Sequence, residues 1–339
     1  MMASLKLLWA NKLASALVFL AAFALGVVVS ILIINNHGSS GAFLSGTCPT
    51  DLTFVKAEQD CGSSDIALNT MSSLQDDLTH DVNAYITTGR ASRISVFVRD
   101  LNSQRFATVN PTESYFMASL LKVPLAVAYY RLAEVTPDIL DQKITYNGDA
   151  SLYALQDIQP QQKLIAGTTY AVKDLIFRML AYSDNAAAAL LTQNYVSDDY
   201  LQKILVTIGL PTRQKGQQEN MTTAMSYAGV FRTLYYSAFL SREYSDDILN
   251  DLSQSTFTDG AVKLLPNGVV VSHKFGERSV INPATGQATL DQLHDCGIVY
   301  GANGTEPYSF CIMTEGKNFP DLESAVQNIS ATIYGDVVR

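Results

Sequence analysis

The chain lacks the short motifs that mark the commonest cofactor sites. It has no Gly-rich phosphate loop of either common type, no C-x-x-C pair and no H-E-x-x-H, so neither a nucleotide nor a metal ion is implied. Positive charge is also scarce, because 23 Lys and Arg stand against 32 Asp and Glu and leave a formal charge of −9. No basic cluster occurs outside the first dozen residues. We therefore expect no cofactor, no metal and no nucleic-acid partner.

The chain has enough apolar sequence for one large domain. Its 339 residues are 47% apolar, which suits a domain of about 250 residues with an N-terminal appendage. Leu13 to Ile34 is an uncharged apolar run of 22 residues. At about 1.5 Å per residue it is long enough to cross a hydrocarbon core of about 30 Å. A cleaved signal peptide is the competing interpretation, but the run exceeds a typical h-region and no convincing small-x-small cleavage site follows it.

The charges around this run predict its orientation. Lys6 and Lys12 precede it, and no further Lys or Arg occurs before Lys56. The positive-inside rule then places the N-terminus in the cytoplasm and the rest of the chain outside the cell membrane. The sequence thus predicts a cytoplasmic N-terminus (1–12), a transmembrane helix (13–34), an extracytoplasmic stalk rich in Ser, Gly and Asp (35–72) and a folded domain (73–339).

A serine and a lysine three residues apart open a buried helical stretch. Ser119 and Lys122 begin SLLKVPLAVAYYRLAEV, and positions i and i+3 lie on one helix face with Cβ atoms about 5–6 Å apart. The Lys122 amine can therefore reach the Ser119 hydroxyl, and it can take its proton if burial or a second cation lowers the lysine pKa. At a helix start the hydroxyl also lies among N–H groups without intrahelical partners, which suits an oxyanion. Pro124 predicts that regular α-helix begins near Leu121.

Two further polar motifs follow in order. Ser183, Asp184 and Asn185 lie between apolar helical runs in VKDLIFRMLAYSDNAAAALL, and Lys274 ends the β-like run GVVVSHKFG. Taken alone, the first triplet is equally well explained as a helix cap, since all three residue types cap helices. A lone lysine is more often an edge-strand charge, but the β-branched run before Lys274 and Gly276 after it favour a strand that lines a substrate.

With S-x-x-K, S-D-N and K-x-G in this order, the chain resembles class A β-lactamases and penicillin-binding proteins. The resemblance covers about Ser73 to Arg339. It implies an α/β (α+β) fold, with an antiparallel sheet flanked by helices, a mainly helical subdomain and the site between the two parts. The segments that resemble the family's elements are, in order, SLQDDLTHDVNAYITT, RISVFVRDL, RFATVN, ESYFMASLLKVPLAVAYYRLAE, ITYNGD, TTYAVKDLIFRMLAYSDNAAAALL, GLPTRQKGQQENMTTAMSYAGVFRTLYYSAFLS, SHKFGE, HDCGIVYGANG, YSFCIMTEG and NFPDLESAVQNISATIYGDVV.

The resemblance also implies a role for each motif residue. Ser119 would attack an amide carbonyl with Lys122 as its base, and Ser183 would pass a proton to the leaving nitrogen. The backbone N–H groups of Ser119 and Glu277 would form the oxyanion hole. The implied substrate-binding residues are Asn185 for a side-chain amide, Lys274 for the substrate anion, and Gly276, Glu277 and Arg278 on the strand that lines the site.

The K-x-G motif departs from the family pattern at its middle residue. Phe275 stands where Thr or Ser is usual, and a phenyl ring cannot hydrogen-bond a substrate carboxylate. Recognition of the carboxylate would then fall to Lys274, Arg278, His273 or His294. A structural role explains His294 slightly better.

The Ω-loop region carries a second departure. The family's E-x-x-L-N, whose Glu drives the water that frees the acyl-enzyme, is absent, and the segment between S-D-N and K-x-G is shortened. Glu219 and Asn220 are the only carboxylate and amide pair in this region. An N-cap-like turn explains them more readily than catalysis. Glu219 is nevertheless the candidate catalytic carboxylate, and we expect deacylation to be slow.

The four cysteines allow three pairings. Cys296 and Cys311 flank GANGTEP symmetrically, so in a hairpin centred there they would face each other on neighbouring antiparallel strands. A cross-strand disulfide and two small buried hydrophobes explain this spacing equally well. Cys48 and Cys61 could close a small loop in the stalk.

The sequence therefore predicts a membrane-anchored, outward-facing serine hydrolase that resembles class A β-lactamases and opens a β-lactam through an acyl-enzyme on Ser119. A D,D-carboxypeptidase or transpeptidase acting on cell-wall peptides would use the same acylation residues and needs no Ω-loop Glu. A catalytically weak module that binds cell-wall fragments is the alternative outside the enzymes.

Overall fold

A computed structural model describes residues 70–154, 156–281, 288–301 and 306–338. The expected transmembrane helix (13–34), nearly all of the expected stalk and the pair Cys48 and Cys61 lie outside the described residues. Within the described ranges, no helix is both long and apolar enough to span a membrane.

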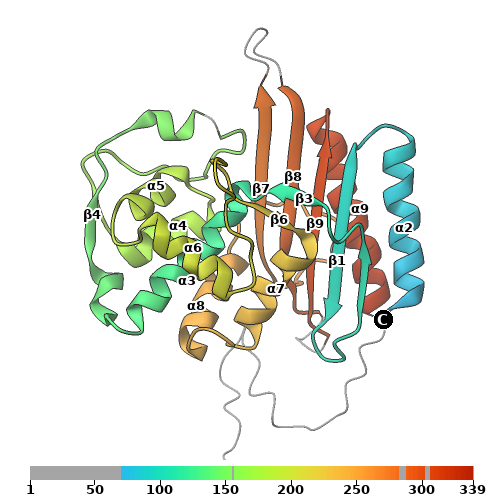
Figure 1. The fold of residues 1–339 in the computed structure, drawn as a ribbon, viewed down its shortest axis with the longest axis horizontal. Helices are drawn as coiled ribbons and strands as arrows, with labels where there is room; N and C mark the ends of the chain where they lie inside the picture. The colour runs from blue at the N-terminus through green and yellow to red at the C-terminus, as the bar shows by residue number, and fades with distance from the viewer. Residues whose placement is uncertain (1–69, 155, 282–287, 302–305, 339) are drawn as a thin grey trace, which may run out of the picture. The chain divides into compact units, whose positions relative to one another are not determined.

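An antiparallel sheet of five strands forms the centre of the described fold (Figure 1). Side chains on β1 alternate between its two faces, since Val96 and Val98 belong to one apolar core and Phe97 to the other. Both faces are therefore covered, which explains the nearly continuous apolar run of this strand. From edge to edge the strands are β2 (Phe106–Val109), β1 (Arg93–Asp100), β9 (Tyr308–Gly316), β8 (Ala288–Val299) and β7 (Val271–Ile281).

The two terminal helices of the described fold cover one face of the sheet (Figure 1). They are α2 (Ser72–Thr87) and α9 (Phe319–Val337). Leu74, Leu78 and Val82 recur at helical spacing in α2 and are almost fully buried. Burying each such side chain contributes about 1.5–3 kcal/mol, so these positions hold the helix to the sheet.

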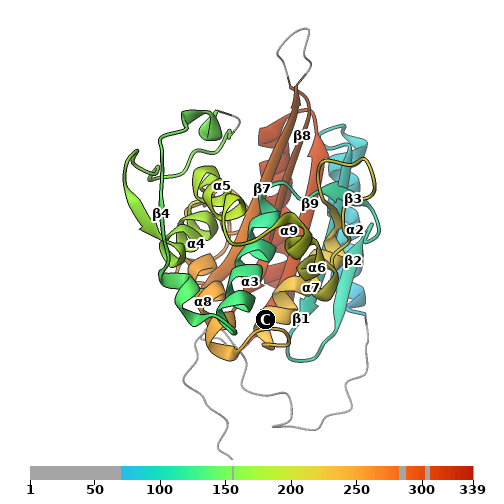
Figure 2. The same cartoon turned by 60° about the vertical axis from the view of Figure 1, so that its left-hand side comes forward.

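The remaining helices form the second part of the fold, against the other face of the sheet and beside β7 (Figure 2). α3 (Lys122–Ala133) is buried on nearly all sides, which marks it as the central helix of this part. The other α-helices are α4 (Val172–Ala181), α5 (Asn185–Gln193), α6 (Asp198–Thr207), α7 (Ala224–Tyr235) and α8 (Arg242–Ser253). The short elements are β3 (Ser114–Phe116), η2 (Ala118–Leu121), η3 (Pro137–Asp141), β4 (Lys143–Thr145), η4 (Ala150–Tyr153), β5 (Thr169–Ala171) and β6 (Met221–Thr223).

The longest hairpin extends beyond the segments that the sequence pattern predicted. β8 begins at Ala288, six residues before the expected start at His294, and pairs with a longer β7. The added part carries polar pairs such as Arg278 opposite Gln292 and Ser279 opposite Asp291. These residues are polar and not β-branched, so the sequence pattern does not mark them as strand. Backbone hydrogen bonds between β7 and β8 extend the two strands through them.

A disulfide bond joins the two central strands β8 and β9. Cys296 and Cys311 are direct register partners and both are fully buried. The hairpin geometry expected from their spacing is confirmed, and the bond decides between the two explanations of the pair.

Candidate active site

Ser119 lies in η2, the 3₁₀ turn that leads into α3. Regular α-helix begins at Lys122, close to the start that Pro124 predicted. The residue before the serine, Ala118, has φ 47°, a left-handed conformation that costs about 1–3 kcal/mol for a residue with a side chain. The Tyr227 hydroxyl on α7 donates to the Leu120 carbonyl at 2.6 Å, which helps to hold the strained turn in place.

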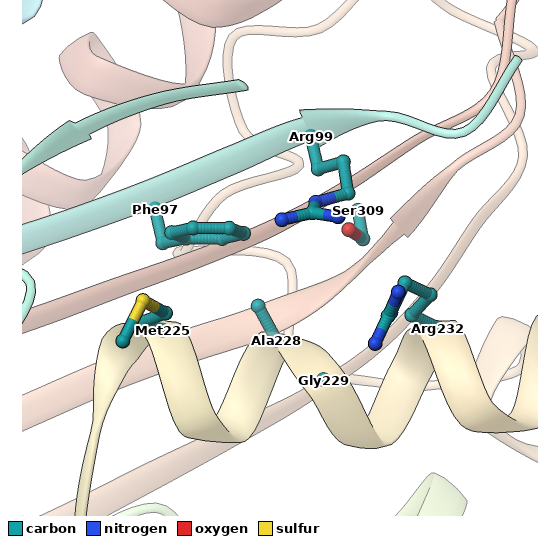
Figure 3. A pocket seen from close by; sticks show the side chains of 7 residues that line it. All are labelled: Phe97, Arg99, Met225, Ala228, Gly229, Arg232 and Ser309. Atoms are coloured by element: carbon teal, nitrogen blue, oxygen red, sulfur yellow. The ribbon is translucent and has the colours of Figure 1, made fainter. Parts of the chain in front are cut away.

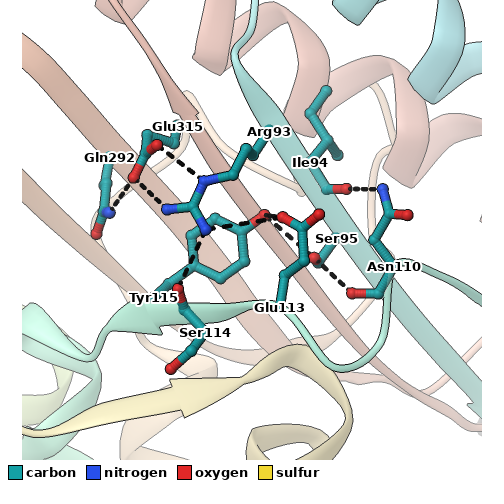
Figure 4. Close-up of polar contacts among 9 residues, drawn as sticks. All are labelled: Arg93, Ile94, Ser95, Asn110, Glu113, Ser114, Tyr115, Gln292 and Glu315. Atoms are coloured by element: carbon teal, nitrogen blue, oxygen red, sulfur yellow. Dashed lines mark hydrogen bonds and ion pairs between the residues drawn. The ribbon is translucent and has the colours of Figure 1, made fainter.

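A polar network holds β3, the strand that precedes this turn (Figure 4). Arg93 of β1 donates to both oxygens of Glu315 at 2.9 and 2.5 Å, and Gln292 donates to the same carboxylate at 2.6 Å. The Arg93 guanidinium also lies 4.7 Å from the ring centroid of Tyr115, whose hydroxyl is 3.1 Å from the Ser95 hydroxyl. Sequence reasoning missed this network, because Arg93 and Glu315 are 222 positions apart and neither carries a local motif.

Lys122 lies under the serine turn in a buried polar pocket. Its amine is 2.6 Å from the Ser183 carbonyl oxygen, 3.1 Å from the Ser183 hydroxyl and 2.7 Å from Oδ1 of Asn185. Burial lowers the pKa of Lys122 to about 7, while the negative charges of Asp184 and Glu277 oppose that shift. An amine with this pKa is substantially neutral near neutral pH, as a general base requires.

Lys274 approaches the same serine from β7. Its amine is fully buried and donates to the Ser183 hydroxyl at 2.8 Å and to the Phe275 carbonyl at 2.9 Å. Burial, and after it the charge of Lys122, holds the pKa of Lys274 well below its ordinary value. The Ser183 hydroxyl therefore bridges two amines, an arrangement suited to passing a proton between groups on either side of it.

The Ser-Asp-Asn triplet caps a helix, and its Ser183 and Asn185 side chains also contact the buried Lys122 amine. Asp184 is the N-cap of α5, where its carboxylate accepts the first free N–H groups at 2.8 and 3.1 Å. Ser183 has φ 54°, and Gln156 donates to its carbonyl at 2.9 Å. The cap and the strained residue before it turn Ser183 and Asn185 toward Lys122. Gln156 was missed, because no sequence signal connects it with the triplet.

Gly276 explains how β7 reaches the serine turn. A Cβ at this position would lie 3.0 Å from the Met117 carbonyl oxygen and 3.3 Å from the Leu120 nitrogen. A side chain would therefore push the strand away from η2. Its absence lets the backbone of β7 at Gly276 lie close beside the serine turn. An oxyanion hole shared between the strand and the turn would need such an approach.

An open cleft of about 340 Å³ brings most of the predicted residues together. Ser183 and Lys274 are not among its lining residues, but the Ser183 hydroxyl accepts from both Lys274 and Lys122, and Lys122 lines the cleft. Leu121, Leu125 and Leu201 give the cleft an apolar wall. The predicted site residues that line it are Ser119, Lys122, Asn185, Glu219, Glu277 and Arg278.

Glu219 lies at the rim of the cleft in an ion pair with Arg278. The guanidinium donates to the two carboxylate oxygens at 2.9 and 2.8 Å and lies 4.0 Å from the ring centroid of Phe116. The N-cap of α7 is Thr223, so the expectation that Glu219 and Asn220 form an N-cap-like turn was wrong. The side chain of Glu219 faces the cleft because Arg278, from β7, holds it there.

The carboxylate of Glu277 is a feature that sequence reasoning overlooked. Oε1 accepts the Ile158 N–H at 2.9 Å, whereas Oε2 is buried and has no hydrogen-bond partner among the described residues. Burial raises the pKa of this carboxyl. The cleft thus contains a second carboxyl group, close to the two lysines.

Neither histidine proposed for anion recognition lines the cleft. His273 is 2% exposed, with Nδ1 2.8 Å from the Asp295 carboxylate. His294 is fully buried, with Nε2 3.1 Å from the Phe116 carbonyl oxygen, and burial lowers its pKa to about 4. The expectation that His273 could contact a substrate carboxylate was wrong, because its side chain is buried against Asp295. The structural role that explained His294 slightly better is confirmed.

Comparisons with known proteins agree with this geometry. The model of the Beta-lactamase enzyme family matches residues 77–337. A β-lactamase of Bacillus licheniformis is 24% identical over 226 residues, which cover 63% of this chain and 68% of the relative.

Solved structures share the fold at lower identity. The TLA-3 extended-spectrum β-lactamase superposes with a TM-score of 0.67 at 19% identity, over 78% of this chain and 100% of that one. A mutant of PBP-A, in an acyl-enzyme complex with penicillin G, gives 0.65 at 18% identity over 79% and 97%. A class A β-lactamase from Mycobacterium abscessus gives 0.63 at 18% identity over 78% and 98%.

The chain belongs to the Beta-lactamase enzyme family and has a class A β-lactamase-like α/β fold. It is a serine hydrolase.

Proposed function

We propose that this serine hydrolase opens the amide bond of a β-lactam through an acyl-enzyme on Ser119. The observation that carries the proposal is the buried Lys122 amine, with its pKa lowered to about 7, in the same cleft as the serine. Neutral Lys122 takes the Ser119 proton while Oγ attacks the carbonyl carbon. The oxyanion is received by the N–H groups of Ser119 and Glu277.

Ring opening needs a proton for the departing nitrogen. Ser183 supplies it, because its hydroxyl is 3.1 Å from Lys122 and 2.8 Å from Lys274. As the C–N bond breaks, the Ser183 proton passes to nitrogen, and the proton that Lys122 took from Ser119 replaces it. The product of this half-reaction is an ester on Ser119 with every amine back in its starting state.

The anionic group of the substrate meets Arg278. Lys274 is fully buried and occupied with Ser183, whereas Arg278 lies at the rim of the cleft in an ion pair. We assign the carboxylate of the β-lactam to Arg278, which exchanges Glu219 for it, and we assign the substrate's side-chain amide to Asn185. An arginine guanidinium can bind a carboxylate with two parallel hydrogen bonds, so this contact does not need the Thr or Ser hydroxyl that Phe275 replaces.

Hydrolysis of the acyl-enzyme is the weak half of the cycle. Glu219 is the carboxylate that we assign to activating water, but both of its oxygens accept from Arg278. Exchange for the substrate carboxylate frees Glu219 from Arg278, but it also removes the contact that holds Glu219 at the cleft, so the carboxylate is poorly placed to take a proton from water. The same arrangement favours a second candidate, a penicillin-binding D,D-peptidase, whose reaction with a β-lactam stops at the acyl-enzyme.

A chromogenic cephalosporin separates the two candidates. A β-lactamase with slow deacylation should release about one equivalent of product rapidly and then continue at a lower steady rate. A burst with no steady phase assigns the protein to the peptidase candidate. The absence of both a burst and turnover in the wild type would contradict both candidates. Ser119→Ala gives the blank, and Ser92→Ala, which changes an exposed serine outside the cleft, should behave like the wild type.

We further propose that residues 13–34 anchor the enzyme in the cell membrane with the domain outside. The support is the uncharged 22-residue run, with Lys6 and Lys12 on its N-terminal side. Protease added to intact cells should release a soluble active fragment. A mature protein that begins near residue 35 would instead indicate a cleaved secretory signal.

A further inference from the structure

A second cavity lies outside the cleft, between the sheet and α7. It has a volume of about 130 Å³ and is formed by side chains of β1, β9 and α7 (Figure 3). None of the proposed catalytic or substrate-binding residues lines it. The residues that matter here are Phe97, Arg99, Met225, Gly229, Arg232 and Ser309.

Two arginines face this cavity. Arg99 extends from β1 and Arg232 from the last turn of α7 (Figure 3). Within the described part of the chain, neither forms an ion pair with Asp or Glu. Arg99 lies 5.5 and 5.6 Å from the ring centroids of Phe97 and Phe106, which fix its position. Burial, and next the charge of Arg232, lowers the pKa of Arg99, so the two cations disfavour each other.

The buried hydroxyl of Ser309 also lies at this cavity. Ser309 is 1% exposed and is the register partner of Arg99 on the neighbouring strand. Its Oγ has no hydrogen-bond partner among the described residues. A buried hydroxyl without a partner is unfavourable, and native proteins rarely leave one unless a water or ligand satisfies it.

The helix leaves room for a ligand at the same place. A Cβ at Gly229 would meet no atom within 4 Å, and alanine would favour the helix over glycine. Phe97 and Met225 provide an apolar side to the cavity. The cavity therefore combines two cations and a hydroxyl with an apolar side and open space. The protein as a whole has a net charge of −9, which repels anions, so this local positive charge is unusual for the chain.

We propose that this cavity binds a phosphate group, with Arg99 and Arg232 as its cationic contacts and the Ser309 hydroxyl as a further donor. The group is either free phosphate or a phosphate monoester whose apolar substituent lies against Phe97 and Met225. Arginine forks suit phosphate oxygens, and the cavity volume suits an ion of that size. The site is independent of the proposed reaction at Ser119.

Calorimetric titration with inorganic phosphate and with phenyl phosphate, at constant ionic strength, tests the proposal. Arg99→Gln and Arg232→Gln should each weaken binding by about tenfold or more, as loss of a charge-assisted contact does. Ser309→Ala should weaken it by severalfold. Gly229→Leu should abolish it while keeping both charges, because the new side chain fills the cavity.

Lys317→Gln is the matched control. Lys317 is exposed and follows the end of β9 opposite to Ser309, so this change removes one positive charge far from the cavity and should leave binding within about twofold.

Tighter binding of phenyl phosphate would support the monoester, and equal binding would support free phosphate. Absence of binding to the wild type, or equal binding by Lys317→Gln, Arg232→Gln and Ser309→Ala, would overturn the proposal. Arg232 is exposed, and the Ser309 hydroxyl has no hydrogen-bond partner among the described residues, so these two variants should fold even if Arg99→Gln does not.

Discussion

The rate at which a β-lactam acylates Ser119 should fall in acid with the titration of Lys122. The amine acts as a base only when neutral, and burial lowers its pKa from 10.5 to about 7. Acidification below pH 7 protonates it, so acylation should be fast at pH 8 and slow at pH 5. A base with an ordinary lysine pKa would instead gain activity up to about pH 10.

The size of the effect follows from the pKa. At pH 7 about half of the Lys122 amines are neutral, compared with about one in 3,000 for a lysine with the ordinary value of 10.5. Burial thus raises the concentration of competent base by about 10³ at neutral pH. At pH 5 only about one amine in 100 is neutral, so the acylation rate should fall about 100-fold below its plateau.

Stopped-flow measurement of the burst with a chromogenic cephalosporin gives this rate directly. Lys122→Met should lower the plateau by about 10²–10⁴-fold, the range of general-base catalysis, and should remove the limb near pH 7. If the acylation rate of Lys122→Met still falls below pH 7, another group, such as Glu277 or Lys274, is the base. An acylation rate that is constant between pH 5 and 8 in the wild type would likewise show that the titration of Lys122 does not control acylation.

Three further predictions concern the rest of the site and the fold. Glu219→Gln should lower the steady phase of cephalosporin hydrolysis by about 10²-fold while sparing the burst; an unchanged steady phase would remove Glu219 from deacylation. Gly276→Ala should slow acylation by about 10²-fold, because its Cβ would lie 3.0 Å from the Met117 carbonyl and displace the serine turn; wild-type burst rates would contradict this close approach. Cys296 and Cys311 should resist alkylation by iodoacetamide in the unfolded, unreduced protein and react after reduction, as judged by mass.

The motifs of the acylation machinery could be predicted from sequence because each is local. Ser119 and Lys122 are three positions apart, and Gly276 follows Lys274 by two, so helix and strand periodicity alone relates their positions. The order of the main segments was implied by the resemblance to class A β-lactamases that these motifs carry. β9 has the bounds of its predicted segment, and α2 begins one residue earlier than predicted.

The partners of these residues could not be predicted, because they come from distant parts of the chain. Arg278 holds Glu219 across 59 positions, and His273 meets Asp295 across 22. Sequence alone therefore does not show whether Glu219 is a carboxylate at the cleft or a turn residue. It also does not show whether His273 binds substrate or has a structural role. Burial of Lys274 was equally hidden, since it depends on the packing of β7 against the helical part.

Intact-protein mass spectrometry after brief exposure to penicillin G shows whether a β-lactam acylates Ser119. We predict a mass increase of one whole penicillin, because ring opening retains all of its atoms, and peptide mapping should place the adduct on Ser119. Ser119→Ala should remain unlabelled with an unchanged melting temperature. An adduct on another residue, or the same mass increase in Ser119→Ala, would show that Ser119 is not the nucleophile.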